Sequence, residues 1–188
     1  MKKILLIIAA TLLSFSLHAM ELAGVKIAEH SQVNGQNLLL NGAGIRTKLF
    51  FKVYVAALYL PQQQTASELV IADAREHRIA LHLLRELSSD KLLHAFNEAI
   101  KDNHSPAELA ALAASLQQMS DIFAAVKEVK TGDVVTLDYV PASGTQISLN
   151  GSVRGTIVGL EFNRALLRIW LGNKPVQNDL KKALLHSE

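Results

Sequence analysis

Alternating apolar and polar residues run through the first half of the chain, and this pattern predicts β-strands. The expected strands cover residues 25–28, 38–40, the long run 46–60, which Pro61 ends, and 77–84. Residues 30–36, around Asn34-Gly35, have the composition of a polar turn. Three further segments are strand-like, at residues 133–140, 145–149 and 153–159.

Apolar residues at helical spacing predict helices over residues 89–101, from Ser105 onward, and over 162–171 and 176–185. Ser105-Pro-Ala-Glu108 combines an N-cap with a proline at the first helical position. Thr65-Ala-Ser-Glu68 has the spacing of a capping box and predicts a short helix ending near Ala72. Strands, helices, strands and helices in this order predict an α+β fold, with an antiparallel sheet that helices cover on one face.

Residues 1–19 are typical of a secretory signal, because two lysines precede an apolar run at 4–17 and a polar exit near His18. We expect cleavage after Ala19, with Ser16 as the alternative, which leaves residues 20–188 as one domain in the periplasm. No later apolar stretch reaches the length that spans a bilayer, so no stable membrane insertion is expected after cleavage.

The charge balance and the missing cysteines exclude several classes of function. Without Lys2 and Lys3, 17 basic residues remain against 17 acidic ones, so the mature chain is neutral and lacks the cationic surface that nucleic acid requires. No cysteine is present to serve as a nucleophile or zinc ligand. The histidines lack metal-ligand spacing and Gly-x-Ser-x-Gly is absent, so we expect neither a metal, nor a cofactor, nor a serine triad.

The densest group of polar side chains lies in the run 46–60. Strict alternation places Arg46, Lys48, Lys52 and Tyr54 on one face of a single strand, which is either a ligand-binding face or the solvated side of the sheet. Arg46 and Tyr54 would be about 26 Å apart on a straight strand, so they can share a ligand only if the chain bends between them. Gly42-x-Gly44 is interpreted as a tight backbone turn, and Trp170 as a core residue.

Several segments together resemble the chalcone isomerase superfamily, and in particular its exported bacterial branch. They are Leu40-Asn-Gly-Ala-Gly-Ile-Arg46, the run from Phe51 to Leu60, Gly151-Ser-Val-Arg-Gly-Thr-Ile-Val-Gly159, the helical segment from Phe162 to Gly172, and residues 173–185. The resemblance implies an open-faced β-sandwich, in which an antiparallel sheet is covered by a helical layer and a ligand cleft lies between them.

In the enzymes of that superfamily an arginine after a Gly-x-Gly turn holds the phenolate, and Arg46 matches it. Tyr54 resembles the corresponding residue of the fatty-acid-binding branch. At the positions of the enzymes' polar helix residues this sequence has apolar side chains instead, those of Leu92, Ala95, Ala99 and Ile169.

The resemblance therefore favours a periplasmic, non-catalytic binder of an apolar acid, either a fatty acid or an aromatic carboxylate. Arg46 and Tyr54 are its expected ligand-binding residues, and no catalytic residue is expected. Two alternatives stay open. One is an isomerase or intramolecular lyase that acts on a phenolic or enone substrate. The other is a structural envelope protein with a closed cleft, in which Arg46 forms a structural ion pair.

Overall fold

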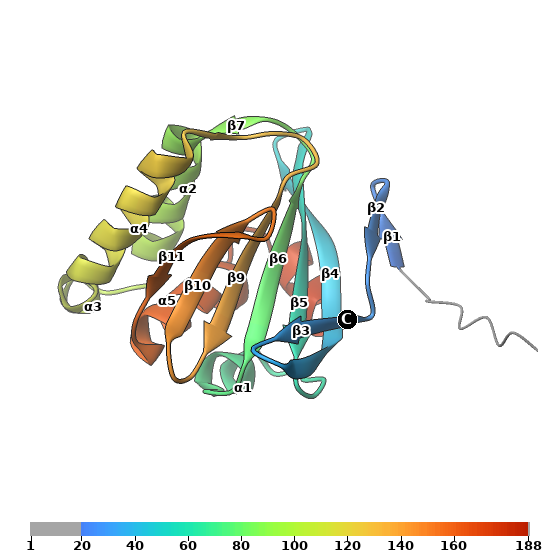
Figure 1. Ribbon diagram of the computed structural model, residues 1–188, viewed down its shortest axis with the longest axis horizontal. Helices are drawn as coiled ribbons and strands as arrows, with labels where there is room; N and C mark the ends of the chain where they lie inside the picture. The colour runs from blue at the N-terminus through green and yellow to red at the C-terminus, as the bar shows by residue number, and fades with distance from the viewer. Residues whose placement is uncertain (1–19, 188) are drawn as a thin grey trace, which may run out of the picture.

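The computed structural model describes residues 20–187, and the expected signal segment lies outside these residues. The main sheet has seven antiparallel strands: β3 (His30–Val33), β4 (Gln36–Lys48), β5 (Phe51–Leu60), β6 (His77–Leu83), β9 (Val134–Val140), β10 (Gly144–Leu149) and β11 (Ser152–Ile157). Their spatial order is β11-β10-β9-β6-β5-β4-β3 (Figure 1). Two short antiparallel pairs accompany the sheet, β1 (Met20–Leu22) with β2 (Val25–Ile27), and β7 (Leu87–Ser88) with β8 (Glu128–Val129).

Six helices are present among the described residues: α1 (Ser67–Ala72), α2 (Ser89–Asp102), α3 (Pro106–Ala111), α4 (Ala113–Val126), α5 (Leu160–Leu171) and α6 (Asn178–Leu185). Helices α2 and α4 stand together at one side of the sheet, while α5 lies behind it in Figure 1. Within residues 20–187 no helix has the length and apolar character needed to cross a bilayer. The expected α+β fold, an antiparallel sheet covered by a helical layer, is confirmed.

The run 46–60 is a hairpin and not the single strand expected from its pattern. Strand β4 ends at Lys48, a turn at Leu49-Phe50 follows, and β5 returns antiparallel to β4. Residues 30–33, expected in a turn, form β3, and only Asn34-Gly35 reverses the chain. The turn at 49–50 was missed because leucine and phenylalanine carry none of the usual turn signals.

Apolar residues fill both faces of β5, so the sheet separates two hydrophobic clusters. The larger cluster joins the sheet to the helices and includes Ala56 and Leu58 of β5. The smaller one lies on the opposite face, where Val55, Ala57 and Tyr59 pack with residues such as Ile27. The helix-covered face therefore holds most of the core, and any space between its layers lies between sheet and helices.

The two expected helix caps have different outcomes. At Ser105 the capping box is present, because the Ser105 hydroxyl accepts from the Glu108 amide and the Glu108 carboxylate accepts from the Ser105 amide. At Thr65 the expectation is wrong: α1 begins after Ala66 with no side-chain cap. The Gln64 side chain accepts from the Thr65 and Ala66 amides instead, both at 2.9 Å.

Gly42 and Gly44 allow close packing and do not form the turn that was expected. Both lie within β4, where α6 crosses the strand. A Cβ atom on Gly42 would overlap the carbonyl oxygen of Ala183, and one on Gly44 would come within 2.8 Å of the Ala183 Cβ. The missing side chains thus let α6 sit directly on β4, beside the segment that carries Arg46.

Candidate functional site

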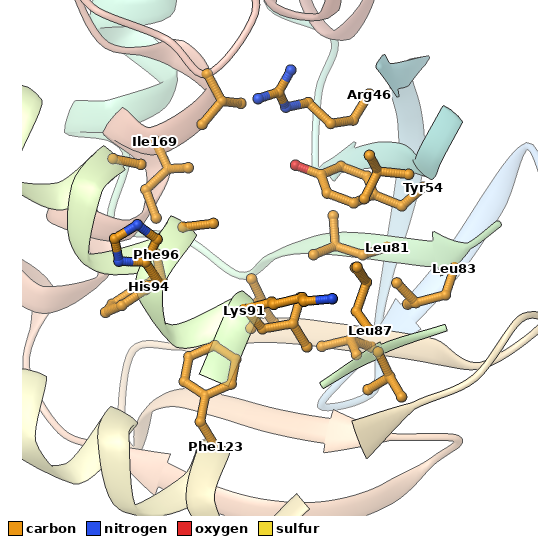
Figure 2. Close-up of a pocket in the computed structure, with 18 of the residues that line it drawn as sticks. Arg46, Tyr54, Leu81, Leu83, Leu87, Lys91, His94, Phe96, Phe123 and Ile169 are labelled. Carbon is orange, nitrogen blue, oxygen red and sulfur yellow. The ribbon is translucent and has the colours of Figure 1, made fainter. Parts of the chain in front are cut away.

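A cavity of about 620 Å³ lies between the sheet and helices α2, α4 and α5. Leu81, Leu137 and Ile147 line it from the sheet, and Phe96 and Phe123 line it from the helices. Figure 2 shows Leu81 opposite the helical residue Phe96. A cleft of this size, largely apolar in its walls, is typical of small-molecule sites. The cleft is therefore open, which contradicts the closed-cleft alternative.

The hairpin brings Arg46 and Tyr54 together in the wall of this cavity. They are cross-strand partners in the β4–β5 register, so the bend that a shared ligand requires is the turn at Leu49-Phe50. A bulge between Arg46 and Thr47 interrupts the register at this point. Figure 2 shows the Arg46 guanidinium and the Tyr54 hydroxyl at the same end of the cavity, away from Phe123.

Arg46 is held by neutral oxygen atoms. Its Nη1 donates to the Thr47 carbonyl oxygen at 2.5 Å and to Gln177 Oε1 at 3.4 Å. The same Gln177 oxygen accepts from the Thr47 amide at 2.8 Å, and Gln177 Nε2 donates to the Ile45 carbonyl at 3.3 Å. Within residues 20–187 Arg46 forms no ion pair, so its charge is not neutralised by a carboxylate.

Tyr54 is the neutral polar group of the site. Trp170 Nε1 donates to its hydroxyl oxygen at 3.0 Å. Burial raises the pKa of Tyr54 above its ordinary value, and the Trp170 hydrogen bond and the Arg46 charge only partly offset this rise. Because the phenol stays protonated at neutral pH and already accepts from Trp170, its own O–H can donate to a ligand.

Two members of this arrangement were not recognised as site residues in the sequence. Trp170 is buried in the core as expected, but its indole N–H is also the partner of Tyr54. Gln177 precedes α6 and lies 131 positions from Arg46 in the chain. No local pattern connects these residues with Arg46, since only the packing of α5 and α6 against the sheet brings them there.

Cations outnumber carboxylates around the cavity. Six basic residues line it, Arg46, Lys48, Arg85, Lys91, Arg154 and Lys174, against the two acidic residues Glu98 and Asp102. Lys48 lines the cavity with Arg46, whereas Lys52, which the alternation placed on the same face, does not. The potential around the cavity therefore favours an anionic ligand.

The positions that correspond to the polar helix residues of the superfamily's enzymes also line the cavity. These are Leu92, Ala95, Ala99 and Ile169, and none has a polar side-chain atom. Among the described residues, no group of three or more His, Asp or Glu side chains is arranged to hold a metal ion.

Comparison with known proteins agrees with the architecture. No curated protein matches the sequence at a significant level. Among solved structures, a fatty-acid binding protein of Arabidopsis thaliana has the same fold, with a TM-score of 0.65, 13% sequence identity, and coverage of 86% of this chain and 92% of that chain. A family model described as chalcone isomerase-like matches residues 19–186. The chain thus belongs to the chalcone isomerase-like family.

Proposed function

We propose that this protein is a non-catalytic binder of an apolar acid, either a fatty acid or an aromatic carboxylate. The observation that carries the proposal is an arginine with no carboxylate partner among the described residues, beside a neutral phenol in the wall of an apolar cavity. Arg46 and Tyr54 would hold the acidic head group, and the apolar walls would surround the hydrocarbon part.

The chemistry of the two groups suits a carboxylate. The guanidinium donates charge-assisted hydrogen bonds and the phenol adds a neutral one, so both oxygens of a carboxylate find donors. The cations around the cavity would attract the anion as it approaches. The neighbouring Arabidopsis protein is itself described as a fatty-acid binding protein, which supports a small apolar ligand for this fold.

Catalysis has less support from the same geometry. Ring closure of a phenolic substrate requires several positioned donors, each worth a few kcal/mol in the transition state. Leu92, Ala95, Ala99 and Ile169 provide none of them. The raised pKa of Tyr54 also makes this phenol a poor base at neutral pH. We expect no chalcone cyclisation above the uncatalysed rate, and enantioselective flavanone formation that disappears in Arg46→Ala would contradict the proposal.

We also propose that the protein is an exported member of the family and acts in the periplasm. The support is the sequence of residues 1–19, with its lysines and its apolar run. Intact-mass analysis of the protein from a periplasmic extract should give a chain that begins near Met20. Recovery of the chain in the cytoplasm with residues 1–19 intact would contradict this localisation.

The binding proposal is tested by titrating a fluorescent fatty acid against the wild type and four variants. Arg46→Ala should weaken binding about ten- to a hundredfold, because a hydrogen bond to a charged group contributes about 1.5–3 kcal/mol. Arg46→Lys should recover only part of this loss, since an ammonium group cannot pair bidentately with a carboxylate. Tyr54→Phe should cost less, about 1 kcal/mol, because it loses a neutral hydrogen bond.

Arg154→Ala is the matched control, because it removes one positive charge from the cavity lining and leaves Arg46 and Tyr54 in place. Its effect on affinity should be smaller than that of Arg46→Ala. Thermal melting of each variant checks that the fold is retained. Equal affinities across the wild type and all variants, with unchanged melting, would show that Arg46 and Tyr54 do not hold the ligand.

A further inference from the structure

The turn between β4 and β5 carries the two most exposed large apolar side chains of the described residues, Leu49 and Phe50, and Phe51 follows directly. Leu49 is 82% exposed, Phe50 96% and Phe51 57%, and we call these three residues the apolar tip. The other exposed large apolar residues, such as Leu69 and Val158, occur singly along the chain. Three consecutive apolar residues in water are unfavourable for an isolated protein and are typical of an interaction surface.

The geometry of the turn does not explain why its residues are apolar. The turns at Asn34-Gly35 and Asn150-Gly151 place Asn and Gly at positive φ, which is the usual chemistry of a tight hairpin. At the apolar tip Leu49 takes a positive φ of 57°, a conformation that is unfavourable for a branched side chain. The apolar residues at this turn are therefore present in spite of local backbone preference.

Positive charge surrounds the apolar tip. Residues 46–54 contain Arg46, Lys48 and Lys52 and no carboxylate. The Arg85 guanidinium lies over the Phe51 ring, 4.9 Å from its centroid. Residues 85–91 add two cations and two carboxylates, so the two segments together carry an excess of three positive charges, although the predicted mature chain is neutral.

The apolar tip is continuous with the cavity. Leu49 and Phe51 both line the cavity, together with Lys48, Arg85 and Lys91, whereas Phe50 and Lys52 do not. In Figure 1 the turn between β4 and β5 lies at the same end of the molecule as β7. An apolar ligand could thus pass between the cavity and whatever the apolar tip contacts without crossing much water.

We propose that the apolar tip docks the protein onto the surface of an anionic phospholipid bilayer, with the cavity open toward the lipid. Apolar side chains that enter the interface, with Lys and Arg beside them at the head groups, are the usual combination for peripheral attachment. A second copy of this chain is disfavoured as the occupant, because two positively charged tips would repel each other. A surface contact of this kind needs no spanning helix.

The test measures co-sedimentation of the exported, purified protein with vesicles that contain phosphatidylglycerol and phosphatidylcholine, or phosphatidylcholine alone. The wild type should bind the anionic vesicles more tightly, and added salt should weaken this binding. Phe50→Ser should weaken it about tenfold or more, since one phenylalanine is no longer buried in the interface. Lys52→Gln should weaken it about fivefold.

Val158→Ser is the matched control, because Val158 is 76% exposed, lies outside the cavity lining and follows the end of β11 at the opposite end of the sheet. It should bind vesicles as the wild type does. All variants share the same N-terminus, so differences between them report on the substituted residue. Equal vesicle binding by the wild type, Phe50→Ser and Val158→Ser would overturn the proposal.

A local probe gives an independent readout. Because the chain has no cysteine, Phe50→Cys or Val158→Cys can be labelled at that one position with a polarity-sensitive fluorophore. Anionic vesicles should shift the emission to the blue only for the label at position 50. The absence of a blue shift at position 50 would overturn bilayer docking. So would a wild-type dimer that Phe50→Ser dissociates, if neither the wild type nor Phe50→Ser binds vesicles, and the apolar tip would then be a protein–protein contact.

None of these measurements uses the cavity ligand. Phe50→Ser and Lys52→Gln should also bind the fluorescent fatty acid in solution as the wild type does, since neither residue lines the cavity. A failure of bilayer docking is therefore distinguishable from a failure of the proposed ligand binding.

Discussion

Strand β5 carries two tyrosines, and each lies directly opposite an arginine on a neighbouring strand. Tyr54 faces Arg46 of β4, and Tyr59 faces Arg78 of β6. Burial raises the pKa of both phenols, and the arginine charge opposes the rise in each case. The two pairs are similar in composition and in register, but they lie on opposite faces of the sheet.

The two pairs differ in what their polar groups contact. Tyr59 donates to the Ala28 carbonyl at 3.0 Å, and Arg78 binds Asp138 through two hydrogen bonds of 2.6 Å and Ser31 through a third. Arg46 has no such carboxylate within residues 20–187, and Tyr54 lines a cavity. A partly buried arginine that is paired with a carboxylate contributes to the fold, whereas one without a carboxylate is available to a ligand.

The largest expected effect comes from breaking the ion pair between Arg78 and Asp138. Arg78→Met leaves the largely buried Asp138 carboxylate without its partner, so the free energy of unfolding should fall by about 3–5 kcal/mol. Arg46→Met removes only hydrogen bonds to neutral oxygens and should change the unfolding free energy by about 1 kcal/mol or less. Urea unfolding of both variants measures the difference. Equal losses would mean that Arg46 is as structural as Arg78.

A second expected effect concerns His77, a buried polar group on the helix-covered face that lies outside the cavity lining. Burial lowers the pKa of His77, which stacks on Tyr139. The folded protein therefore keeps the imidazole neutral, while the unfolded chain takes up a proton below about pH 6.5. Stability from this group is present above that pH and is lost as the pH falls, by up to about 1.4 kcal/mol per pH unit.

The measurement is urea unfolding at several pH values between neutral and mildly acidic. His77→Gln should flatten the loss of stability at low pH, and His30→Gln, which changes an exposed histidine in the same way, is the matched control. Burial also lowers the pKa of His82, so some pH dependence should remain in His77→Gln. If the unfolding free energy of His77→Gln falls with decreasing pH as steeply as that of the wild type, His77 does not control the acid sensitivity.

The third expected effect separates the two phenols. Tyr59→Phe loses the hydrogen bond to Ala28 and should lower the unfolding free energy by about 1 kcal/mol, with ligand affinity unchanged. Tyr54→Phe should lower ligand affinity and leave the unfolding free energy nearly unchanged, because cavity water can accept from the Trp170 N–H in place of the phenol. Urea unfolding and fatty-acid titration of both variants test whether one tyrosine affects stability and the other affinity. A stability loss in Tyr54→Phe as large as in Tyr59→Phe, with no affinity loss, would contradict it.

The smallest expected effect is a pKa change at Tyr54. Trp170→Phe keeps an aromatic ring in the core but removes the N–H that stabilises the phenolate, so the pKa of Tyr54 should rise further. Absorbance titration of the tyrosines measures it, with Tyr54→Phe identifying the Tyr54 signal. The signal of Tyr59 should not move, since Trp170 donates to Tyr54. An unchanged or lower pKa for Tyr54 would contradict the assigned hydrogen bond.

Local rules predicted much of the fold. The cap at Ser105, the strand at 77–83 and the apolar stripe of α5 follow from neighbouring residues, because capping and amphipathic periodicity act over a few positions. The hairpin at 49–50 was not predicted, since an apolar turn has no local signal. The cap expected at Thr65 was wrong because Gln64 supplies the acceptor in its place.

Hydrophobic patterning predicted the α+β order of elements, and the resemblance to a known superfamily directed attention to Arg46 and Tyr54. Tertiary structure decided that these residues face each other across a turn, that Gln177 and Trp170 contact them, and that no carboxylate among the described residues neutralises Arg46. Arg46 and Tyr54 were not paired from the sequence because the apolar turn between them carries no local signal. For Gln177 and Trp170 the physical reason is their distance from these two residues along the chain. Contacts between residues more than a hundred positions apart depend on how helices pack on a sheet, and no short pattern encodes that packing.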